Sequence, residues 1–318
     1  MLHPDASVWR DHIILTRDLA TPGERSDFCR RARRGDYVAV RPGAYVPADQ
    51  WHGLGAAEQH LTRVRANLVF SDRDLVFSHH SAAVLWRLPW FGELPARVHV
   101  VDEKATGGRS TSVLARHAIG VPTAVERIDG VGLTTLARTV SDVASVATFA
   151  QSVVVADAAL RRSEHPIAAV PETRVTREDL LRELDHVPLR HGQVKARRAI
   201  EFADGAADRP GESLSRTNML LAGLTMPRLQ KCLRGASGKV YWVDFWWPEF
   251  RLIGEFDGKA KYTEAQFLGG RTPSQALYDE KKREDDLRAT GKGFTRWPWE
   301  VAISMPRLRH HLQAAGVR

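Results

Sequence analysis

The chain has 318 residues, which is long enough to bury sizeable cores and predicts two or three domains. No apolar stretch approaches about 18 residues, and the N-terminus MLHPDASVWRDH lacks the basic start and apolar centre of a signal peptide, so we expect a cytoplasmic protein without a membrane partner. The net charge of +8 favours a polyanionic partner, because neutralising phosphates releases counterions.

Cysteine usage gives a second indication of the compartment. The two cysteines, Cys29 and Cys232, lie far apart in the sequence and in different predicted domains. This number and spacing indicate neither a disulfide framework nor a zinc site. The pattern is typical of a reducing compartment.

The N-terminal segment predicts a winged helix over residues 1–50. Thr16 is expected to cap a short helix through Leu19, and Ser26 is expected to cap a second helix that ends at Gly35. The second helix is the most basic short segment of the chain, with Arg30, Arg31, Arg33 and Arg34. DYVAVR and AYV then alternate as two strands joined at Pro42-Gly43, which would form the wing. The second helix of a helix-turn-helix enters the major groove, whereas a solvated basic face is the alternative here.

Residues 57–162 predict an α+β segment. Helical periodicity marks AEQHLTRVRANLVF, SHHSAAVLWRL, TTLARTVSDVASV and AQSVVVADAALRR, and alternation marks RVHVV and TSVLARHA as strands. His79 and His80 beside Ser81 suggest catalysis. No cysteine or acid stands at a convincing spacing from them, however, and a helix capped by Ser78 explains these residues more simply.

Three segments of this region, RRGDYVAVRPGAYV, SHHSAAVLWRLP and LARTVSDVA, resemble the abortive-infection antitoxin family AbiEi. In that family a winged helix precedes an α+β domain, and the resemblance covers about residues 10–165. It implies DNA binding, repression of an operon, and a nucleotidyltransferase toxin as a further partner. At the matching positions the implied DNA contacts are Arg30, Arg31 and Arg34 on the helix, with Arg41 on the wing. No toxin-like sequence accompanies them in this chain.

The next segment predicts a bridge between domains. Residues 163–175 contain prolines and lack periodicity, which indicates a linker or crossover. Thr176 opens the helix TREDLLRELDHV, whose acidic first turn suits the helix dipole, and LRHGQVKARRAIEFAD follows as a second helix. We therefore expect an α+β domain at 51–165, a helical linker at 166–204 and a C-terminal domain at 205–318.

The C-terminal domain contains the run VYWVDFWWPEFRLIGEFDGKAK, which predicts an antiparallel hairpin with its turn at residues 248–250. Asp244 stands in an otherwise aromatic and β-branched strand, where an unpaired carboxylate has no packing role. On the second strand, side chains two residues apart share one face, and those on this face are Glu255, Asp257 and Lys259.

Carboxylates that the hairpin brings together repel each other, and removing each charge from water costs several kcal/mol unless something compensates it. Oxygen ligands favour Mg²⁺ or Mn²⁺ over zinc. We expect Asp244, Glu255 and Asp257 to ligate the ion, and Lys259 to hold a water nucleophile and steady the charge on a phosphate. The alternative is a hairpin whose acids pair with nearby Arg and Lys.

An aspartate followed at this distance by acid-x-Lys resembles the PD-(D/E)XK nuclease superfamily, whose core is a restriction-endonuclease-like αβββαβ sandwich. Two registers fit, because Asp244 with Asp257-x-Lys259 keeps the lysine, whereas Asp244 with Glu255-x-Asp257 puts an acid in its place. GESLSR, VDFWWPE, EFDGK and YDEKKREDDLRATGKGFTRWPWE together resemble the small family related to very-short-patch-repair endonucleases. In that family the second register is usual, and the resemblance implies Glu212 as a helix acid supporting the metal. An acid in a first helical turn also suits the helix dipole alone.

The sequence therefore predicts an α+β protein in which a winged helix and an α+β domain precede a restriction-endonuclease-like αβββαβ domain that hydrolyses DNA with Mg²⁺ or Mn²⁺. Lys281 and Arg283 on the helix after the hairpin are expected to contact the DNA backbone. Phage defence and DNA repair are the roles that fit such an enzyme. The competing hypothesis is a non-enzymatic, antitoxin-like repressor with an inactive nuclease fold. The partners to test are DNA, a cognate toxin or defence protein, and a second copy of the chain.

Overall fold

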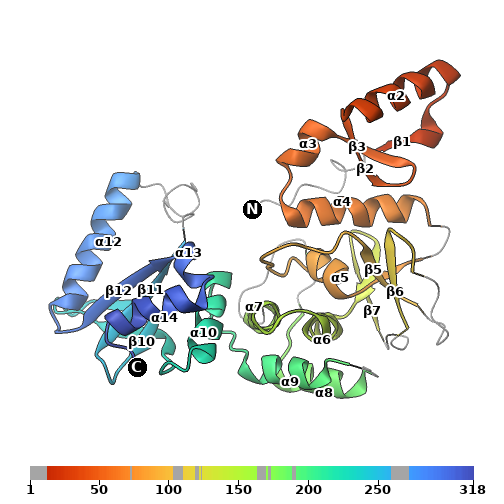
Figure 1. Ribbon diagram of the computed structural model, residues 1–318. Coiled ribbons are helices and arrows are strands. Elements are labelled where there is room, and N and C mark those ends of the chain that lie inside the picture. The colour runs from red at the N-terminus through yellow and green to blue at the C-terminus, as the bar shows by residue number, and fades with distance from the viewer. Residues whose placement is uncertain are drawn as a thin grey trace. The chain divides into compact units, whose positions relative to one another are not determined.

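A computed structural model describes residues 13–71, 74–102, 110–118, 122, 124–162, 170, 173–187, 191–258 and 272–318. The protein is mixed α+β, with three separate sheets in this described part (Figure 1). It divides into two compact units, unit 1 comprising Met1–Val146 with Pro166–Arg197, and unit 2 comprising Ala147–His165 with Arg198–Arg318. None of the described helices combines the length and the apolar character needed to cross a lipid bilayer.

The two units do not follow the order of the chain. Helix α7 (Phe149–Arg161) belongs to unit 2 and packs on α10 (Pro210–Leu221), whereas α8 (Arg177–His186) belongs to unit 1 and packs on α6 (Leu136–Val146). The chain leaves unit 1 after α6 and returns to it at α8. It leaves again within α9 (Gln193–Phe202). The two helices of the expected linker are therefore divided between the units instead of forming a separate bridge.

The N-terminal part of unit 1 is a basic helix followed by a small antiparallel sheet of order β1-β3-β2. Its elements are β1 (Ile14–Leu15), the 3₁₀ turn η1 (Thr16–Asp18), α2 (Pro22–Arg34), β2 (Tyr37–Arg41), β3 (Ala44–Pro47), α3 (Ala48–Gly53) and α4 (Ala56–Val69). Val40, Val46 and Trp51 form its buried core with Ala66 of α4. The two predicted strands and their turn at Pro42-Gly43 are present.

Helix α2 begins one turn earlier than the sequence suggested. Thr21, not Ser26, is the N-cap, because its hydroxyl accepts from the backbone N of Glu24 at 3.2 Å. The Glu24 carboxylate accepts in return from the backbone N of Thr21 at 3.0 Å. This reciprocal pair satisfies two donors that would otherwise lack partners, which outweighs a serine cap further along. At the other end, Gly35 terminates the helix with φ 91°, as predicted.

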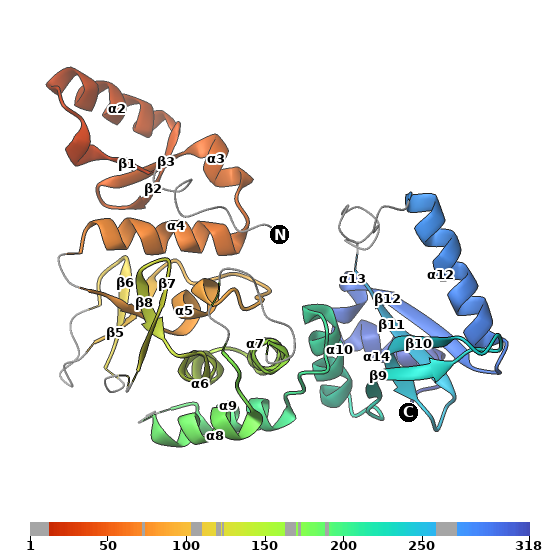
Figure 2. The same cartoon turned by 180° about the vertical axis from the view of Figure 1, so that it is seen from behind.

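The second part of unit 1 is a five-stranded mixed sheet of order β6-β5-β4-β8-β7. Its strands are β4 (Val76–Phe77), β5 (Val98–Val101), β6 (Leu114–His117), β7 (Val125–Ile128) and β8 (Val131–Thr134). Pairs β5/β6 and β4/β8 are parallel, and pairs β4/β5 and β7/β8 are antiparallel. Helix α5 (His79–Leu85) packs on β5 and on α6, so it lies between the sheet and the helical layer (Figure 2).

The sequence predicted the helices of this part and strands β5 and β6, but it missed β4, β7 and β8. Strand β4 has only two residues, and β8 is buried at all four positions, so it shows no alternation of apolar and polar residues. The turn between β7 and β8 is Asp129-Gly130, with φ 50° and 77°. Asp-Gly is a strong signal for a tight hairpin. That dipeptide could have revealed both strands.

Unit 2 contains a four-stranded sheet of order β12-β11-β10-β9, in which β11 and β12 are parallel and the other pairs antiparallel. After α10, its elements are β9 (Arg228–Arg234), β10 (Val240–Trp247), β11 (Leu252–Asp257), α12 (Pro273–Arg288), β12 (Gly293–Pro298), α13 (Trp299–Ala302) and α14 (Met305–Ala314). From α10 to β12 the described elements are, in chain order, a helix, three strands, a helix and a strand.

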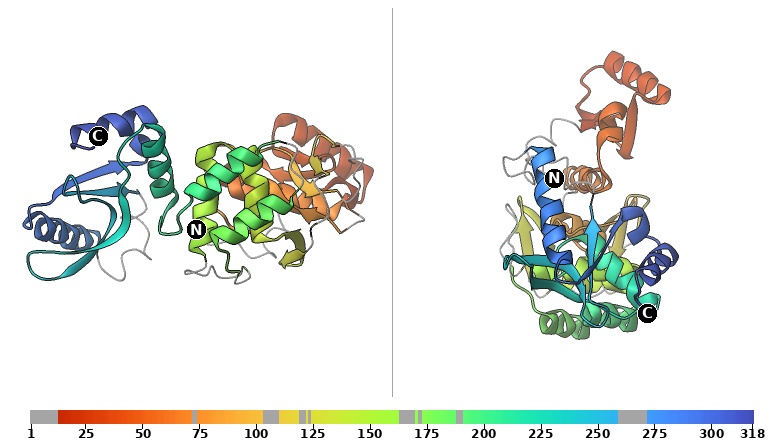
Figure 3. Two further views of the ribbon diagram at one scale, coloured as in Figure 1. Left: turned by 90° about the horizontal axis from the view of Figure 1, so that it is seen from below. Right: turned by 90° about the vertical axis from the view of Figure 1, so that its left-hand side faces the viewer.

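Helices cover both faces of this sheet (Figure 3, right). On one face, Phe245, Trp247 and Trp297 form the larger core with residues of α10, α13 and α14. On the other face, Val243 and Ile253 form a smaller cluster with Leu287 of α12. The sheet is therefore the central layer, and α10 and α12 lie on opposite sides of it.

Helix α10 is buried along most of its length although its sequence is polar. Its polar side chains find partners inside the unit, as buried hydrogen-bonding groups must. Ser215 Oγ accepts from Trp297 Nε1 at 2.8 Å, and Asn218 Nδ2 donates to the carbonyl of Ala302 at 2.7 Å. Arg216 forms a buried ion pair with Asp157 of α7 at 2.9 Å. These contacts fix the position of the helix.

We predict that Gly211→Ala destabilises unit 2. A Cβ at this position would lie 2.1–2.6 Å from ring atoms of the buried Phe256, and such overpacking costs about 1–3 kcal/mol. This exceeds the gain of up to about 1 kcal/mol from replacing glycine in a helix. Urea unfolding followed by circular dichroism measures the effect. The control is Gly23→Ala on α2, where the nearest atom would be 3.9 Å away and no loss is expected; equal midpoints for the two variants would contradict the packing.

Candidate functional site

Three acids from three different elements of unit 2 lie near one another, since the charge of Asp244 acts on each of the other two. Glu212 comes from the first turn of α10, Asp244 from the middle of β10 and Glu255 from β11. Glu212 and Glu255 are 2% and 3% exposed, and Asp244 is partly buried. Asp257 ends β11 and is also partly buried. Lys259 lies outside the described residues.

The pairing of β9 with β10 is interrupted at Asp244. The β9–β10 ladder pairs Val243 with Lys231 and Phe245 with Leu229 but leaves out Asp244 and Gln230. Gln230 has φ 43°, an uncommon value for a residue other than glycine. Residues two apart in β10 also pack on opposite faces of the sheet here. Val243 packs with Leu287 of α12, whereas Phe245 packs in the larger core on the other face. The regular alternation of side chains between the two faces of the sheet therefore fails at this aspartate.

Gln230 and the backbone of β11 hold Asp244 in place. Phe256 donates its backbone N–H to Asp244 Oδ2 at 3.0 Å, which draws the carboxylate toward β11. The Gln230 amide donates to Glu212 Oε2 at 3.1 Å and approaches Asp244 Oδ1 at 3.5 Å. The backbone N of Asp208 also donates to Glu212 Oε2, at 2.9 Å. One strained residue thus bridges the acids of α10 and β10.

The protonation of Glu212 is strongly perturbed. Burial disfavours its charged form, and the negative charge of Asp244 adds to that effect, so the pKa of Glu212 is raised to about 8. Hydrogen bonds from Asp208 and Gln230 act in the opposite direction but are weaker. Two acids that share a site in this way are typical of functional centres.

Glu255 has a different environment, because two arginines neutralise it. Arg283 of α12 forms a charge-assisted hydrogen bond with Oε1, and Arg296 of β12 lies 3.2 Å from Oε2 without hydrogen-bond geometry. Both arginines also pair with Glu280 of α12. Burial still raises the pKa of Glu255, with the two arginines opposing that shift and the charge of Asp244 adding to it. The alternative of acids paired with nearby arginines therefore holds for this residue.

The acids do not form the tight group of three ligands that the sequence suggested. Among the described residues, no three carboxylates offer oxygens that all lie within 4.8 Å of one another. Mg²⁺ usually takes only one or two carboxylates and completes its shell with waters and substrate oxygens. Glu212 and Asp244 fit this requirement best, because their mutual repulsion is the feature a divalent cation would relieve.

The predicted DNA contacts of the N-terminal part have two kinds of environment. Arg30, Arg31 and Arg34 are exposed on α2, where Arg30 pairs with Asp27 and Arg31 pairs with Asp36. Such exposed ion pairs are weak and exchange readily. Arg41 is instead partly buried. Its guanidinium lies 4.2 Å from the centre of the Phe70 ring and donates to Asn67 of α4 at 3.1 Å, so it contributes to the fold.

The predicted contacts on α12 also differ from each other. Lys281 is exposed on the helix. Arg283 is not, because its guanidinium is engaged with Glu255, Glu280 and the carbonyl of Trp242. A contact with a phosphate would require Arg283 to give up part of this network. The expectation placed it on the helix surface, and the tertiary structure turns it toward the acids.

Two features of the site were missed in the sequence. Gln230 stands in RLQKCLR, a strand in which a glutamine carries no signal of its own. Glu280 belongs to YDEKKREDD, where charges are so dense that no single one stands out. Pairing across strands and helices, which the sequence does not specify, selects these side chains.

Comparison with known proteins gives relatives without a described function. The chain is 29% identical over 262 residues to uncharacterized proteins from two strains of Mycobacterium tuberculosis, and the match covers 78% of this chain and 90% of each relative. No family model matches the chain, and no solved structure matches it.

We predict that Glu212→Gln makes the protein more stable at alkaline pH. The folded state keeps the Glu212 proton up to about pH 8, whereas the unfolded chain releases it near its ordinary pKa of 4.5. Stability therefore falls as the pH rises between these values, and glutamine removes this loss. Melting temperatures in EDTA should be similar for variant and wild type near pH 5, and the variant should melt several degrees higher near pH 9.

The matched control for this experiment is Glu249→Gln. It removes the same charge from the exposed turn between β10 and β11. Its difference from wild type should not grow with pH. A constant difference between Glu212→Gln and wild type at every pH would contradict the raised pKa of Glu212.

Proposed function

We propose that this protein is a metal-dependent DNA endonuclease that uses Mg²⁺ or Mn²⁺, with its site in unit 2 and a DNA-binding element at α2. The observation that carries the proposal is the gathering of Glu212, Asp244 and Glu255 from a helix and two neighbouring strands. Two of these acids are buried, which is costly for a charged group unless it is paired, protonated or bound to a cation. The order of elements from α10 to β12 agrees with a restriction-endonuclease-like domain and supports the same interpretation.

The residues of the site divide the work of phosphodiester hydrolysis between them. A divalent ion bound at Glu212 and Asp244 would polarise the phosphate of the DNA and activate a water molecule. Asp244 is held by the backbone of Phe256 and by Gln230, so its carboxylate is oriented before substrate binds. Glu212, with its pKa raised to about 8, can carry a proton at neutral pH and release it when a cation approaches. Lys259 remains the proposed donor to the developing phosphate charge.

The N-terminal part of the proposal concerns DNA binding through a winged helix. Helix α2 is followed directly by the hairpin β2–β3, and its arginines face solvent on a helix whose only buried residue is Phe28. A helix packed by one side chain leaves most of its surface for a partner. The net charge of +8 adds a long-range attraction for a polyanion.

One observation favours the second candidate, a non-enzymatic repressor with an inactive nuclease fold. Glu255 is already neutralised by Arg283 and Arg296, so this acid needs no metal to be stable in the fold. A site that has exchanged metal for arginine would keep its architecture and lose its chemistry. Cleavage assays distinguish the two candidates.

We predict that Asp244→Asn lowers DNA cleavage by about 10² fold or more, the scale of losing one group that stabilises the transition state. Asparagine keeps an oxygen for the Phe256 N–H but removes the charge that would hold the metal. Nicking of plasmid DNA with Mg²⁺ or Mn²⁺, against an EDTA blank, measures the effect. Asp285→Asn on the exposed surface of α12 is the control and should cut at the wild-type rate.

The same assay separates the two registers of the acid pair. If Lys259 occupies the working lysine position, Lys259→Ala also reduces cleavage by about 10² fold. If Glu255 and Asp257 fill the positions instead, Glu255→Gln is the inactivating change and Lys259→Ala is mild. Circular dichroism must confirm that Glu255→Gln folds, since the variant removes the charge of one of the two acids that both arginines share. Absence of cleavage by the wild type with either ion would leave the repressor as the function.

We predict that replacing Arg30 and Arg34 together with alanine weakens duplex binding. These residues stand four apart on the exposed face of α2, so both can reach one strand of DNA. The slope of log K against log salt should fall by about one for each phosphate that the variant no longer neutralises. The control replaces Arg177 and Arg182 on α8, which removes the same charge from another exposed helix. Equal slopes in both double variants would remove α2 as the DNA-binding element.

A further inference from the structure

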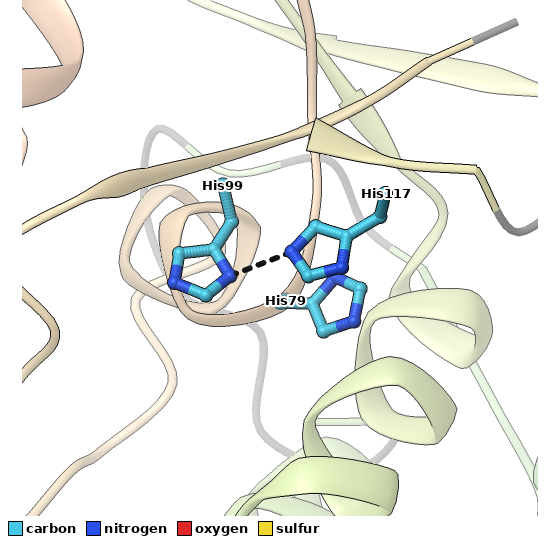
Figure 4. A group of neighbouring side chains, drawn as sticks. All are labelled: His79, His99 and His117. Atoms are coloured by element: carbon cyan, nitrogen blue, oxygen red, sulfur yellow. Dashed lines mark hydrogen bonds between the residues drawn. The ribbon is translucent and has the colours of Figure 1, made fainter. Parts of the chain in front are cut away.

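A second group of titratable side chains lies in unit 1, far along the chain from the acids. It consists of His79 at the start of α5, His99 on β5 and His117 at the end of β6 (Figure 4). Each offers a ring nitrogen, and the three nitrogens lie within 4.8 Å of one another. Among the described residues, only these three His, Cys, Asp or Glu side chains meet this criterion together.

The arrangement follows from the sheet. Strands β5 and β6 are parallel, with His99 opposite Ala115, so His117 stands two residues further along and on the same face as His99. Helix α5 follows β4 directly and packs on β5, and the backbone N–H of Ser78 donates to the carbonyl of His99 at 3.0 Å. The sequence gives no sign of this group, since the three histidines come from three separate segments.

The rings are in direct contact. His99 Nδ1 and His117 Nε2 are 2.9 Å apart and share a hydrogen bond, while the rings of His79 and His117 stack with centroids 3.8 Å apart. Two nitrogens bound to one tetrahedral zinc, at Zn–N distances of about 2.0–2.1 Å, lie roughly 3.3 Å apart. Replacing the shared proton with a metal ion would require the His99 and His117 nitrogens to move apart by a few tenths of an ångström. The stacked His79 ring would also have to turn, because a ring nitrogen binds metal in the plane of its ring.

A second layer of polar groups stands behind His79. Its Nδ1 is 3.0 Å from Ser78 Oγ and 3.8 Å from Asp142 Oδ2 of α6. Asp142 is fully buried, and its Oδ2 has no hydrogen-bond partner, although Arg138 donates to Oδ1 at 2.8 Å. A histidine that binds metal through one nitrogen commonly donates its other N–H to a carboxylate. Ser78 was expected to cap α5, but its side chain makes no cap and turns to His79 instead.

We propose that His79, His99 and His117 form a binding site for a divalent transition-metal ion, with zinc as the ion of choice. Three imidazoles without an acid among them favour Zn²⁺ over Mg²⁺. Asp142 would orient His79 by accepting its Nδ1 proton. The cysteine pattern gave no indication of zinc, because the ligands are histidines that only the fold brings together.

Two further observations agree with this site. His79 has φ 49°, and residues held in this uncommon region cluster at functional positions, where the surrounding structure enforces them. Burial lowers the pKa of all three rings, that of His99 to about 3, so they are neutral and able to bind metal at neutral pH. His99 and His117 are partly exposed, which gives an ion access to the group.

The test is a titration of untagged, EDTA-treated full-length protein with Zn²⁺ and with Co²⁺. We expect one equivalent of Zn²⁺ per chain by calorimetry, and the intense visible absorption of tetrahedral Co²⁺ displaced by Zn²⁺. The measurement is made in the Asp244→Asn background, so that the acids of unit 2 do not contribute. Its outcome is independent of whether the protein cuts DNA.

Variants assign the bound ion to this group. His117→Gln, at a partly exposed position, should abolish the Co²⁺ spectrum, and Asp142→Asn should weaken Zn²⁺ binding about 10–100 fold, as for loss of a carboxylate behind a ligand. His186→Gln, on the exposed end of α8, is the control and should bind like its Asp244→Asn parent. Failure of that parent to bind Zn²⁺ stoichiometrically, or unchanged binding by His117→Gln, would overturn the proposal.

Discussion

The buried ion pair between Asp157 and Arg216 is the interaction on which the candidate site depends. It joins α7 to α10, and the same carboxylate accepts from the backbone N of Asp204 at 2.7 Å. Breaking such a pair leaves an uncompensated charge in the interior, at a cost of about 3–5 kcal/mol. Because Glu212 and Arg216 stand four residues apart on the same helix, this pair also fixes Glu212 against the sheet. Chain connectivity would not do so, since α8 and α9 lie between the two helices in the chain.

The acids of the candidate site in unit 2 have two kinds of electrostatic environment. Glu255 is compensated inside the protein by Arg283 and Arg296, whereas Glu212 and Asp244 share a site where a glutamine amide bridges them. The first arrangement is stable by itself. The second stores electrostatic repulsion, which contributes to the raised pKa of Glu212. The proposed cation would therefore be better placed between Glu212 and Asp244 than beside Glu255.

Burial also controls the charge of the clustered titratable side chains in unit 1, where these side chains are histidines. Its histidines are neutral because burial disfavours the imidazolium form, and so they gather without repulsion. A charged carboxylate at such a buried position would need a counter-charge. Neutral imidazole rings can instead stack and share a hydrogen bond without a metal. Oxygen ligands in one unit and nitrogen ligands in the other would select different ions, in line with the preferences of hard and borderline cations.

The sequence alone determined the α+β character, most helices, and strands β2, β3, β5, β6, β10 and β11, because periodicity, glycines and turn residues are local signals. It also singled out Asp244, whose charge contradicts its apolar surroundings. Only the tertiary structure decided which side chains meet. It placed Gln230 between two acids, turned Arg283 from the surface to Glu255, and joined His79 to His99 and His117. Such contacts depend on strand order and helix packing, which arise from the whole chain and leave no trace in any single segment.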